Sequence, residues 1–194
     1  MECTIKPIDT LETERLVLRP LLASDFAAVH SWACNPENVR YMSFGPNSEE
    51  ETHSFLERAI ARPGKDFAVV LKETGRVIGS CGLYTHPAMI HDCGEVGWIL
   101  HMDHWKQGYG TELAGELLRY GFEDLKLRWI VAPCAVVNYG SYRVMERNGM
   151  KREAVHVKAF WARIDQEWID EAVYTILSED YFASRFCDIG KRCF

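Results

Sequence analysis

Seven segments of the chain are short and rich in aliphatic, aromatic or β-branched residues, which is the pattern of β-strands. They cover residues 16–21, 67–71, 77–84, 94–100, 128–134, 150–160 and 167–177. The first predicted strand ends near Pro20, because proline cannot donate a hydrogen bond to a β-ladder. The second and third form a predicted hairpin across the turn Glu73-Thr74-Gly75.

Apolar residues that recur every three or four positions predict helices between these strands. The predicted helices begin near residues 24, 47, 111 and 141. Ser24 or Asp25 caps the first helix, and Pro36 is expected to end it. The second opens with the acidic run 49–51, which suits the positive end of a helix dipole. Gly149 is a natural terminator for the fourth helix, because glycine adopts the left-handed conformation easily.

The predicted order of elements is β-α-α-β-β-β-α-β-α-β-β, followed by a tail, residues 178–194, that shows little periodicity. Such an order favours an α/β fold with one central mixed sheet flanked by helices. The chain has 194 residues and contains no internal repeat or linker-like stretch. A single domain that spans residues 1–194 is therefore expected.

The composition excludes several classes of protein. Hydrophobic residues make up 47% of the chain, and no run approaches the roughly 18 apolar residues that a transmembrane helix needs. The first residues show no signal-peptide pattern, so the cytoplasm is the expected location. The net charge of −6 argues against nucleic acid as the main partner and is compatible with a cationic substrate.

The cysteines and histidines do not predict a metal centre. The seven cysteines are odd in number and form no C-x-x-C pair, which argues against a disulfide framework or a thiolate zinc site. Five candidate ligands lie close in sequence: His86, His91, Cys93, His101 and His104. The last two histidines would share a face only on a helix, whereas a strand end and a loop are predicted there. Polar residues around a turn are the preferred interpretation.

A glycine-bearing turn, Trp105 to Gly110, joins a predicted strand to a predicted helix. Unpaired N–H groups and the positive end of the dipole make such a helix start suitable for phosphate. Gly108 and Gly110 allow an anion to approach the backbone. The spacing matches neither a Walker A loop nor a dinucleotide-binding fingerprint. From these residues alone, a plain tight turn is an equally good explanation.

Three runs together are more specific: EVGWIL at 95–100, WKQGYGTE at 105–112 and NYGSYRVMERNGM at 138–150. With the opening ETERLVLRP at 12–20, they resemble the GNAT acetyltransferases. The resemblance is greatest to the RimJ/RimL-like branch, which acetylates the N-termini of ribosomal proteins. It covers about residues 13–177 and implies a central, mostly antiparallel mixed sheet with helices on both faces.

The resemblance also implies acetyl-CoA as co-substrate, with no metal. In the family, backbone N–H groups of the glycine turn bind the pyrophosphate of coenzyme A. The corresponding residues of this chain are Trp105, Lys106, Gln107, Gly108, Tyr109, Gly110 and Thr111. Trp105 replaces the more usual Gln or Arg, as in the RimJ/RimL-like branch. Lys106 either adds charge to the phosphates or is a solvated loop lysine.

The catalytic candidates come from the same resemblance. Asn138 either hydrogen-bonds the pantetheine arm or caps a helix, and both roles are compatible. Ser141 is the candidate general acid for the departing thiolate, with Tyr139 and Tyr142 in reserve. Glu95 is the candidate base, working through water, although an ion-paired strand residue is the alternative. Cys134 is interpreted as a small buried hydrophobe rather than a nucleophile.

Six aromatic residues are candidates for an acceptor pocket or, more simply, for the core: Trp32, Phe44, Tyr84, Trp98, Phe160 and Trp161. Phe44 and Tyr84 are preferred as substrate-binding residues because both lie near predicted loops.

The leading functional prediction is acetyl transfer to a protein or peptide N-terminal amine, by direct attack of the amine on the thioester. One alternative is a small amine such as an aminoglycoside, a polyamine or a toxin. A second alternative is a non-catalytic module that binds acyl-CoA. A protein acceptor predicts an open acidic groove, whereas a small amine predicts a closed pocket. The protein is expected to be a monomer or a homodimer.

Overall fold

The protein is described by a computed structural model, which covers residues 10–85 and 92–191 and, for 186–191, the backbone alone. Its strands form one sheet in the order β1-β2-β3-β4-β5-β6-β8-β7. Their bounds are β1 Leu11–Glu12, β2 Leu16–Pro20, β3 Asp66–Leu71, β4 Val77–Thr85, β5 Cys93–Leu100, β6 Trp129–Ala135, β7 Lys151–Ala162 and β8 Glu167–Leu177. Neighbouring strands are antiparallel except for β5 and β6, which are parallel.

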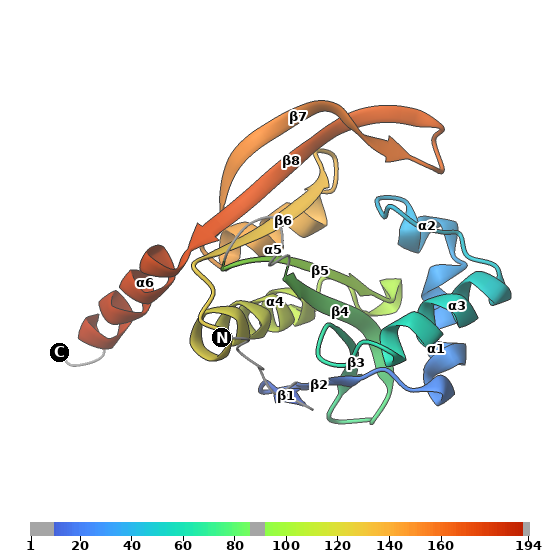
Figure 1. The fold of residues 1–194 in the computed structure, drawn as a ribbon, viewed down its shortest axis with the longest axis horizontal. Helices are drawn as coiled ribbons and strands as arrows, with labels where there is room; N and C mark the ends of the chain where they lie inside the picture. The colour runs from blue at the N-terminus through green and yellow to red at the C-terminus, as the bar shows by residue number, and fades with distance from the viewer. Residues whose placement is uncertain (1–9, 86–91, 192–194) are drawn as a thin grey trace.

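Helices cover both faces of the sheet (Figure 1). Their bounds are α1 Phe26–Ala33, α2 Pro36–Val39, α3 Glu49–Ile60, α4 Tyr109–Arg119, α5 Tyr139–Arg147 and α6 Ser178–Lys191. Short 3-10 turns, η1 Ala23–Asp25 and η2 Met102–His104, and a π-helical turn, η3 Tyr120–Asp124, complete the described chain. The predicted mixed, mostly antiparallel sheet between helices is confirmed.

Two hydrophobic cores lie on opposite faces of the sheet. On one face, α4 and η3 pack against the central strands through residues such as Leu113, Leu117 and Phe122. On the other face, α1 and α3 pack through Trp32 and Leu56, together with other apolar residues. The split follows the alternation along each strand, since neighbouring side chains point to opposite faces.

The structure corrects the prediction for Pro36. This proline was expected to end the first helix, but α1 ends at Ala33 and Pro36 begins α2. Proline suits the first position of a helix, because its φ is already helical and its missing N–H would have no partner there. Asn35 caps the new helix by accepting a hydrogen bond from the Glu37 amide at 2.9 Å.

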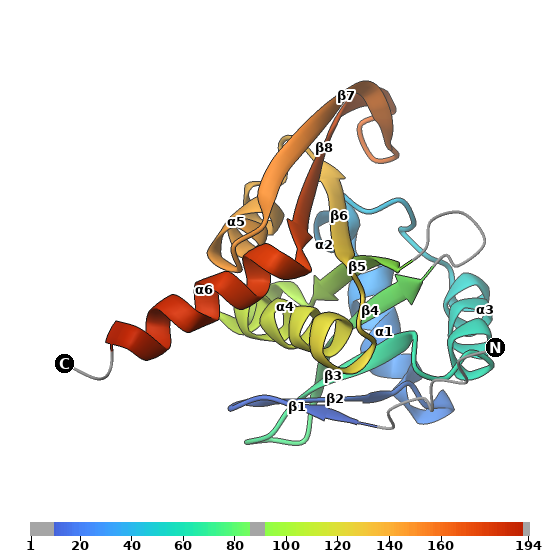
Figure 2. The same cartoon turned by 60° about the vertical axis from the view of Figure 1, so that its left-hand side comes forward.

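The other helix starts follow from their capping residues. Ser48 and Glu51 form a capping box at the start of α3, with hydrogen bonds of 3.1 and 2.8 Å. The C-terminal tail is helical: Tyr181 of α6 packs on Phe122, with ring centroids 4.9 Å apart. The rest of α6 extends away from the body of the protein (Figures 1 and 2).

The central strands β5 and β6 are paired over only part of their length. Cα pairing covers Cys93 with Trp129, Gly94 with Ile130 and Glu95 with Val131, and it stops there. Beyond Glu95 the two strands separate, and β6 stays paired with β8 instead (Figure 1). The ends of β5 and β6 therefore offer backbone and side chains to a space inside the sheet.

Candidate active site

Two cavities meet where β5 and β6 separate. The first, of about 970 Å³, lies among α1, α3, β4, β5 and the β7–β8 hairpin, and we call it the acidic cavity. The second, of about 780 Å³, lies among α2, the start of α4 and the start of α5, and we call it the basic cavity. Six residues line both: Tyr41, Met42, Trp98, Ile99, Asn138 and Ser141. A ligand in one cavity can thus contact a ligand in the other.

The two cavities differ in charge. Among the described residues, four cations and one carboxylate, Glu37, line the basic cavity; the cations are Arg40, Lys106, Arg143 and Arg147. Carboxylates outnumber cations in the acidic cavity, where Asp66, Glu95 and Glu171 accompany Arg58 and Arg163. The basic cavity therefore suits a polyanion, and the acidic cavity suits a cation.

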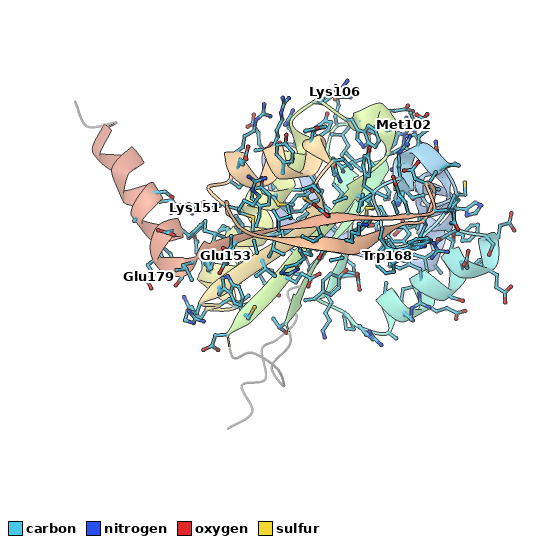
Figure 3. The ribbon with its side chains drawn as sticks, turned by 90° about the horizontal axis from the view of Figure 1, so that it is seen from above. Met102, Lys106, Lys151, Glu153, Trp168 and Glu179 are labelled. Atoms are coloured by element: carbon cyan, nitrogen blue, oxygen red, sulfur yellow. The ribbon has the colours of Figure 1, made fainter. Side chains whose placement is uncertain are left out.

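The glycine turn shapes the basic cavity at the start of α4. Lys106 and Gly108 both have positive φ, +60° and +86°, and Gly108 is the N-cap of α4. The first N–H groups of a helix have no partner within the helix and attract an anion. Lys106 is exposed and lies at the edge of the molecule, at the same end as Met102 (Figure 3). The geometry fits the phosphates of coenzyme A.

Side chains hold this turn in place. The Trp105 indole donates to the Leu100 carbonyl at 2.8 Å, and the Gln107 amide donates to the Asp103 carbonyl at 2.9 Å. Six of the seven predicted turn residues line the basic cavity: Trp105, Lys106, Gly108, Tyr109, Gly110 and Thr111. Gln107 lines neither cavity, because its side chain folds back onto η2.

The acidic cavity has a nearly bare floor on β4 and β5. Gly82 and Gly97 face each other across the two strands, and a Cβ on Gly97 would meet nothing within 4 Å. Next along the strands, Tyr84 faces Glu95. The Tyr84 ring crosses over Gly82, and its hydroxyl donates to a carboxylate oxygen of Asp66 on β3. Tyr84, Glu95 and Asp66 therefore form one polar row at the end of the cavity.

The environment keeps Tyr84 in its neutral form. Burial and the hydrogen bond to the Asp66 carboxylate raise the pKa of Tyr84 far above its ordinary value of 10.0. A neutral phenol is a hydrogen-bond donor, so it stays bound to Asp66 at neutral pH. Phe44, the other predicted acceptor-pocket residue, lines the same cavity. So do the remaining aromatic candidates, Trp32, Trp98, Phe160 and Trp161.

Asn138 and Ser141 lie at the start of α5, between the two cavities. The Asn138 side chain caps the helix by accepting a hydrogen bond from the Ser141 amide at 3.1 Å. Of the three candidate acids, only Ser141 lines both cavities. Tyr139 lines only the basic cavity. Tyr142 lines neither cavity because its ring stacks on that of Tyr174, with ring centroids 6.3 Å apart.

Cys134 lines the acidic cavity but lacks the properties of a nucleophile. Burial, with a smaller contribution from Glu171, raises the pKa of the Cys134 thiol to about 11. The thiol is therefore protonated at neutral pH, whereas a nucleophilic cysteine needs a lowered pKa.

The described residues contain no group of three or more His, Cys, Asp or Glu placed to hold a metal ion. His101 caps η2 and His104 is its last residue, with ring centroids 6.4 Å apart, so the predicted loop contains a 3-10 turn; Cys93 is buried on β5. His86 and His91 lie outside the described residues. Within the described part of the chain, no helix is long and apolar enough to span a membrane.

Residues 15–151, more than half of the chain, match the family described as the acetyltransferase (GNAT) domain. The chain is a GNAT acetyltransferase. It is an acetyl-CoA-dependent N-acetyltransferase. The family expected from the sequence motifs is confirmed.

Relatives and solved structures agree with this membership. The acetyltransferase is 30% identical over 171 residues to an uncharacterized N-acetyltransferase, YnaD, of Bacillus subtilis, covering 88% of this chain and 98% of that protein. It is 31% identical over 173 residues to the FsC-acetyl coenzyme A-N(2)-transacetylase of Aspergillus fumigatus, covering 84% of this chain and 72% of that protein. A GNAT-family acetyltransferase from Bacillus anthracis superposes with a TM-score of 0.80 at 32% identity, covering 88% and 99%.

Several residues of the site have no signal in the local sequence. Glu171 belongs to a strand predicted from its apolar pattern, Asp66 directly precedes another, and nothing near them in sequence indicates a cavity. Trp168 lies on the β7–β8 hairpin and lines the acidic cavity (Figure 3). These residues of the acetyltransferase line one cavity although β3 and β8 are not neighbours in the sheet.

Proposed function

We propose that this acetyltransferase transfers the acetyl group of acetyl-CoA to a cationic primary amine that binds in the acidic cavity. The observation that carries the proposal is the meeting of two oppositely charged cavities at Asn138 and Ser141. A polyanionic donor and a cationic acceptor would each enter the cavity of complementary charge. Their reacting groups would then meet between β5 and β6.

The donor occupies the basic cavity in this proposal. Free N–H groups at the start of α4 bind the diphosphate, and nearby cations such as Arg143 and Arg147 add charge. The left-handed Gly108 lets the turn approach the phosphates closely. The pantetheine arm then runs past Asn138 toward the point where the strands separate.

Glu95 and Ser141 carry the proton transfers in this proposal. An ammonium has no free electron pair, so the acceptor must lose a proton, which Glu95 takes through a water molecule. The neutral nitrogen attacks the thioester carbon, and the C–S bond breaks as the C–N bond forms. The electron pair of the broken bond leaves on sulfur, which the Ser141 hydroxyl protonates. The attacking nitrogen loses its second proton to the same water path, and solvent restores the serine proton.

The preferred acceptor is a protein or peptide N-terminal amine, as in the RimJ/RimL-like branch that the motifs resemble. Trp161 and Trp168 pack together at the acidic cavity with ring centroids 5.3 Å apart, and 55% of Trp168 is exposed. Such an exposed aromatic surface suits the side chains that follow a peptide N-terminus.

One observation favours the alternative acceptor, a small amine. Arg40, which follows α2, pairs at 2.8 Å with Asp165 in the turn between β7 and β8. Their neighbours Tyr41 and Arg163 line the acidic cavity. The ion pair thus connects the two sides of the cavity and narrows the space open to a polypeptide. The cytoplasmic location and the monomeric or homodimeric state remain predictions from the sequence.

The first test is the thermal shift caused by acetyl-CoA. Ligand at about 100 times its dissociation constant adds about 2.7 kcal/mol, which raises Tm by roughly 5–11 °C for a domain of this size. Gly108→Glu is expected to abolish the shift. Gly75→Glu is the matched control, because Gly75 also has positive φ (+66°) and its Cβ would meet nothing within 4 Å. Absence of any shift in the wild-type protein at millimolar acetyl-CoA contradicts the proposal.

The second test separates the acceptor classes by measuring release of the CoA thiol. Peptides with free N-termini, the same peptides with blocked N-termini, and small mono- and diamines are compared by kcat/KM. The preferred proposal predicts that free N-terminal peptides exceed every small amine. The reverse order supports the alternative, and no turnover with any amine favours a binding module.

A further inference from the structure

Arg15 lies behind the glycine turn, on the side away from the basic cavity. It follows β1 and directly precedes β2, and it does not line either cavity. Its guanidinium nevertheless reaches three consecutive residues of the turn. Nη1 donates to the Gln107 carbonyl at 3.0 Å, and the guanidinium carbon lies 4.5 Å from the Tyr109 ring centroid. Between them, a Cβ on Gly108 would lie 3.2 Å from Nη2.

A carboxylate fixes the guanidinium in this place. Glu112, in the first turn of α4, accepts hydrogen bonds from Nε and from the backbone amide of Arg15, both at 2.7 Å. Nη2 lies 2.7 Å from the same carboxylate, and Thr13 donates to it at 2.5 Å. Burial raises the pKa of Glu112, but the hydrogen bonds from Thr13 and Arg15 outweigh burial and lower the pKa below its ordinary value. The carboxylate is therefore ionised and holds Arg15 at neutral pH.

The turn needs such support because its backbone is strained. Lys106 has a φ of +60°, a conformation that costs a residue with a side chain about 1–2 kcal/mol. Gln107, between the two positive-φ residues, points its carbonyl toward Arg15. This hydrogen bond fixes the peptide plane between Gln107 and Gly108, and because the carbonyl and N–H of a trans peptide point in opposite directions, the Gly108 N–H points away from Arg15. Arg15 also neutralises Glu112, which would otherwise repel a phosphate at the start of α4.

We infer that Arg15 is a positioning residue for the diphosphate of the donor: it holds the glycine turn from behind and acts on coenzyme A only through the turn. The inference rests on the proposed function, because it presupposes that the basic cavity binds coenzyme A. The planar guanidinium of Arg15 contacts Gln107 and Glu112 at the same time, and its flat face lies over the ring of Tyr109. Lysine has neither feature.

The test measures the dissociation constant of CoA calorimetrically for the wild-type protein and three variants. Arg15→Ala is expected to raise this constant by about tenfold or more, the effect of losing a charge-assisted hydrogen bond network. Arg15→Lys is expected to lie close to Arg15→Ala, and it carries the test if the alanine variant does not fold. Arg185→Ala is the matched control, because Arg185 also contacts a carboxylate and a tyrosine ring. Arg185 pairs with Glu123 at 2.6 Å, and its guanidinium carbon lies 4.8 Å from the centroid of the Tyr181 ring. It should change CoA affinity by less than about twofold.

A kinetic measurement separates positioning from general damage. With saturating acetyl-CoA, Arg15→Ala is expected to keep the wild-type kcat and acceptor KM, while the KM for acetyl-CoA rises. An affinity for CoA within about twofold of wild type, or full recovery in Arg15→Lys, overturns the inference. An equal loss of kcat shows that Arg15 is merely structural. A wild-type protein that binds no CoA instead refutes the proposed function itself.

Discussion

Gly82 and Gly97 face each other across β4 and β5, yet alanine at the two positions has opposite consequences. A Cβ on Gly82 would lie 2.5 Å from the Tyr84 hydroxyl oxygen and 2.7 Å from the Lys65 carbonyl oxygen. Both distances are shorter than any van der Waals contact. The Lys65 oxygen belongs to the backbone, so it cannot move aside as a side chain can. A Cβ on Gly97 would enter open space in the acidic cavity. The Gly82→Ala variant must therefore move Tyr84 away from Asp66.

The magnitude follows from these contacts. Overpacking in a filled site costs about 1–3 kcal/mol, and the hydrogen bond from Tyr84 to the Asp66 carboxylate contributes about 1.5–3 kcal/mol. Alanine also restricts the unfolded chain more than glycine does, which raises the free energy of unfolding by about 0.4–1 kcal/mol. Gly82→Ala is thus expected to lower the free energy of unfolding by about 2–5 kcal/mol. Gly97→Ala, which makes no close contact, is expected to raise the free energy of unfolding by up to about 1 kcal/mol.

Urea denaturation of both variants, with Tyr84→Phe as a third, measures these differences. Tyr84→Phe removes only the hydroxyl, so the difference between it and Gly82→Ala reports overpacking together with the smaller, opposite effect of alanine on the unfolded chain. Gly97→Ala should fold stably but show a lower kcat/KM for the acceptor, because the added methyl group occupies the floor of the acidic cavity. The reasoning is refuted if Gly82→Ala unfolds within about 0.5 kcal/mol of the wild-type protein, because the close approach of Tyr84 would then be absent.

Three further predictions concern catalysis and acid stability. Glu95→Gln should lower kcat by about 10²- to 10⁴-fold near pH 7 without changing the acetyl-CoA dissociation constant, and an unchanged kcat would exclude Glu95 as the base. Ser141→Ala should lower the rate of CoA thiol release more than Tyr142→Phe does, because only Ser141 lines both cavities; the reverse ranking would reassign the acid. Burial raises the pKa of Asp25, but the hydrogen bonds from Arg19 and from the Leu22 amide, together with the Arg19 charge, outweigh burial and lower the pKa below its ordinary value of 3.8. The stabilisation by ionised Asp25 is present above pH 3.8 and is lost as the pH falls below that value. The Asp25→Asn variant should therefore show a smaller decline of the urea midpoint between roughly pH 5 and 2. A decline equal to that of the wild-type protein would contradict this prediction.

Most of the helices and strands, and the family, follow from the amino-acid sequence alone. The segments predicted from apolar alternation correspond to seven of the strands in the sheet, and Gly149 follows the end of α5 with a positive φ, as expected. These features are local: a strand or helix is set by periodicity within about ten residues, and a cap by the side chain beside it. The short strand β1 was missed because two residues carry no periodicity.

Local rules also left some roles open. Pro36 is compatible with the end of one helix and with the start of another, and only the packing of α2 decided between them. Gln107 belongs to the predicted cofactor turn, but its side chain found a partner on η2 and turned away from the cavity. Asn138 caps α5 and lines both cavities, so the two roles expected for it from sequence do not conflict.

Which residues share a site depends on the three-dimensional arrangement of the strands and helices. Asp66, Tyr84 and Glu95 come from three strands: the register places Tyr84 opposite Glu95 and Asp66 opposite Gly82, and the Tyr84 ring crosses Gly82 to reach Asp66. The cavities exist because β6 leaves β5 after Glu95 while it keeps its pairing with β8. Arg15 reaches the glycine turn from more than ninety residues away in sequence. Register, strand separation and such long-range contacts depend on the balance of packing over the whole sheet, and no local pattern encodes that balance.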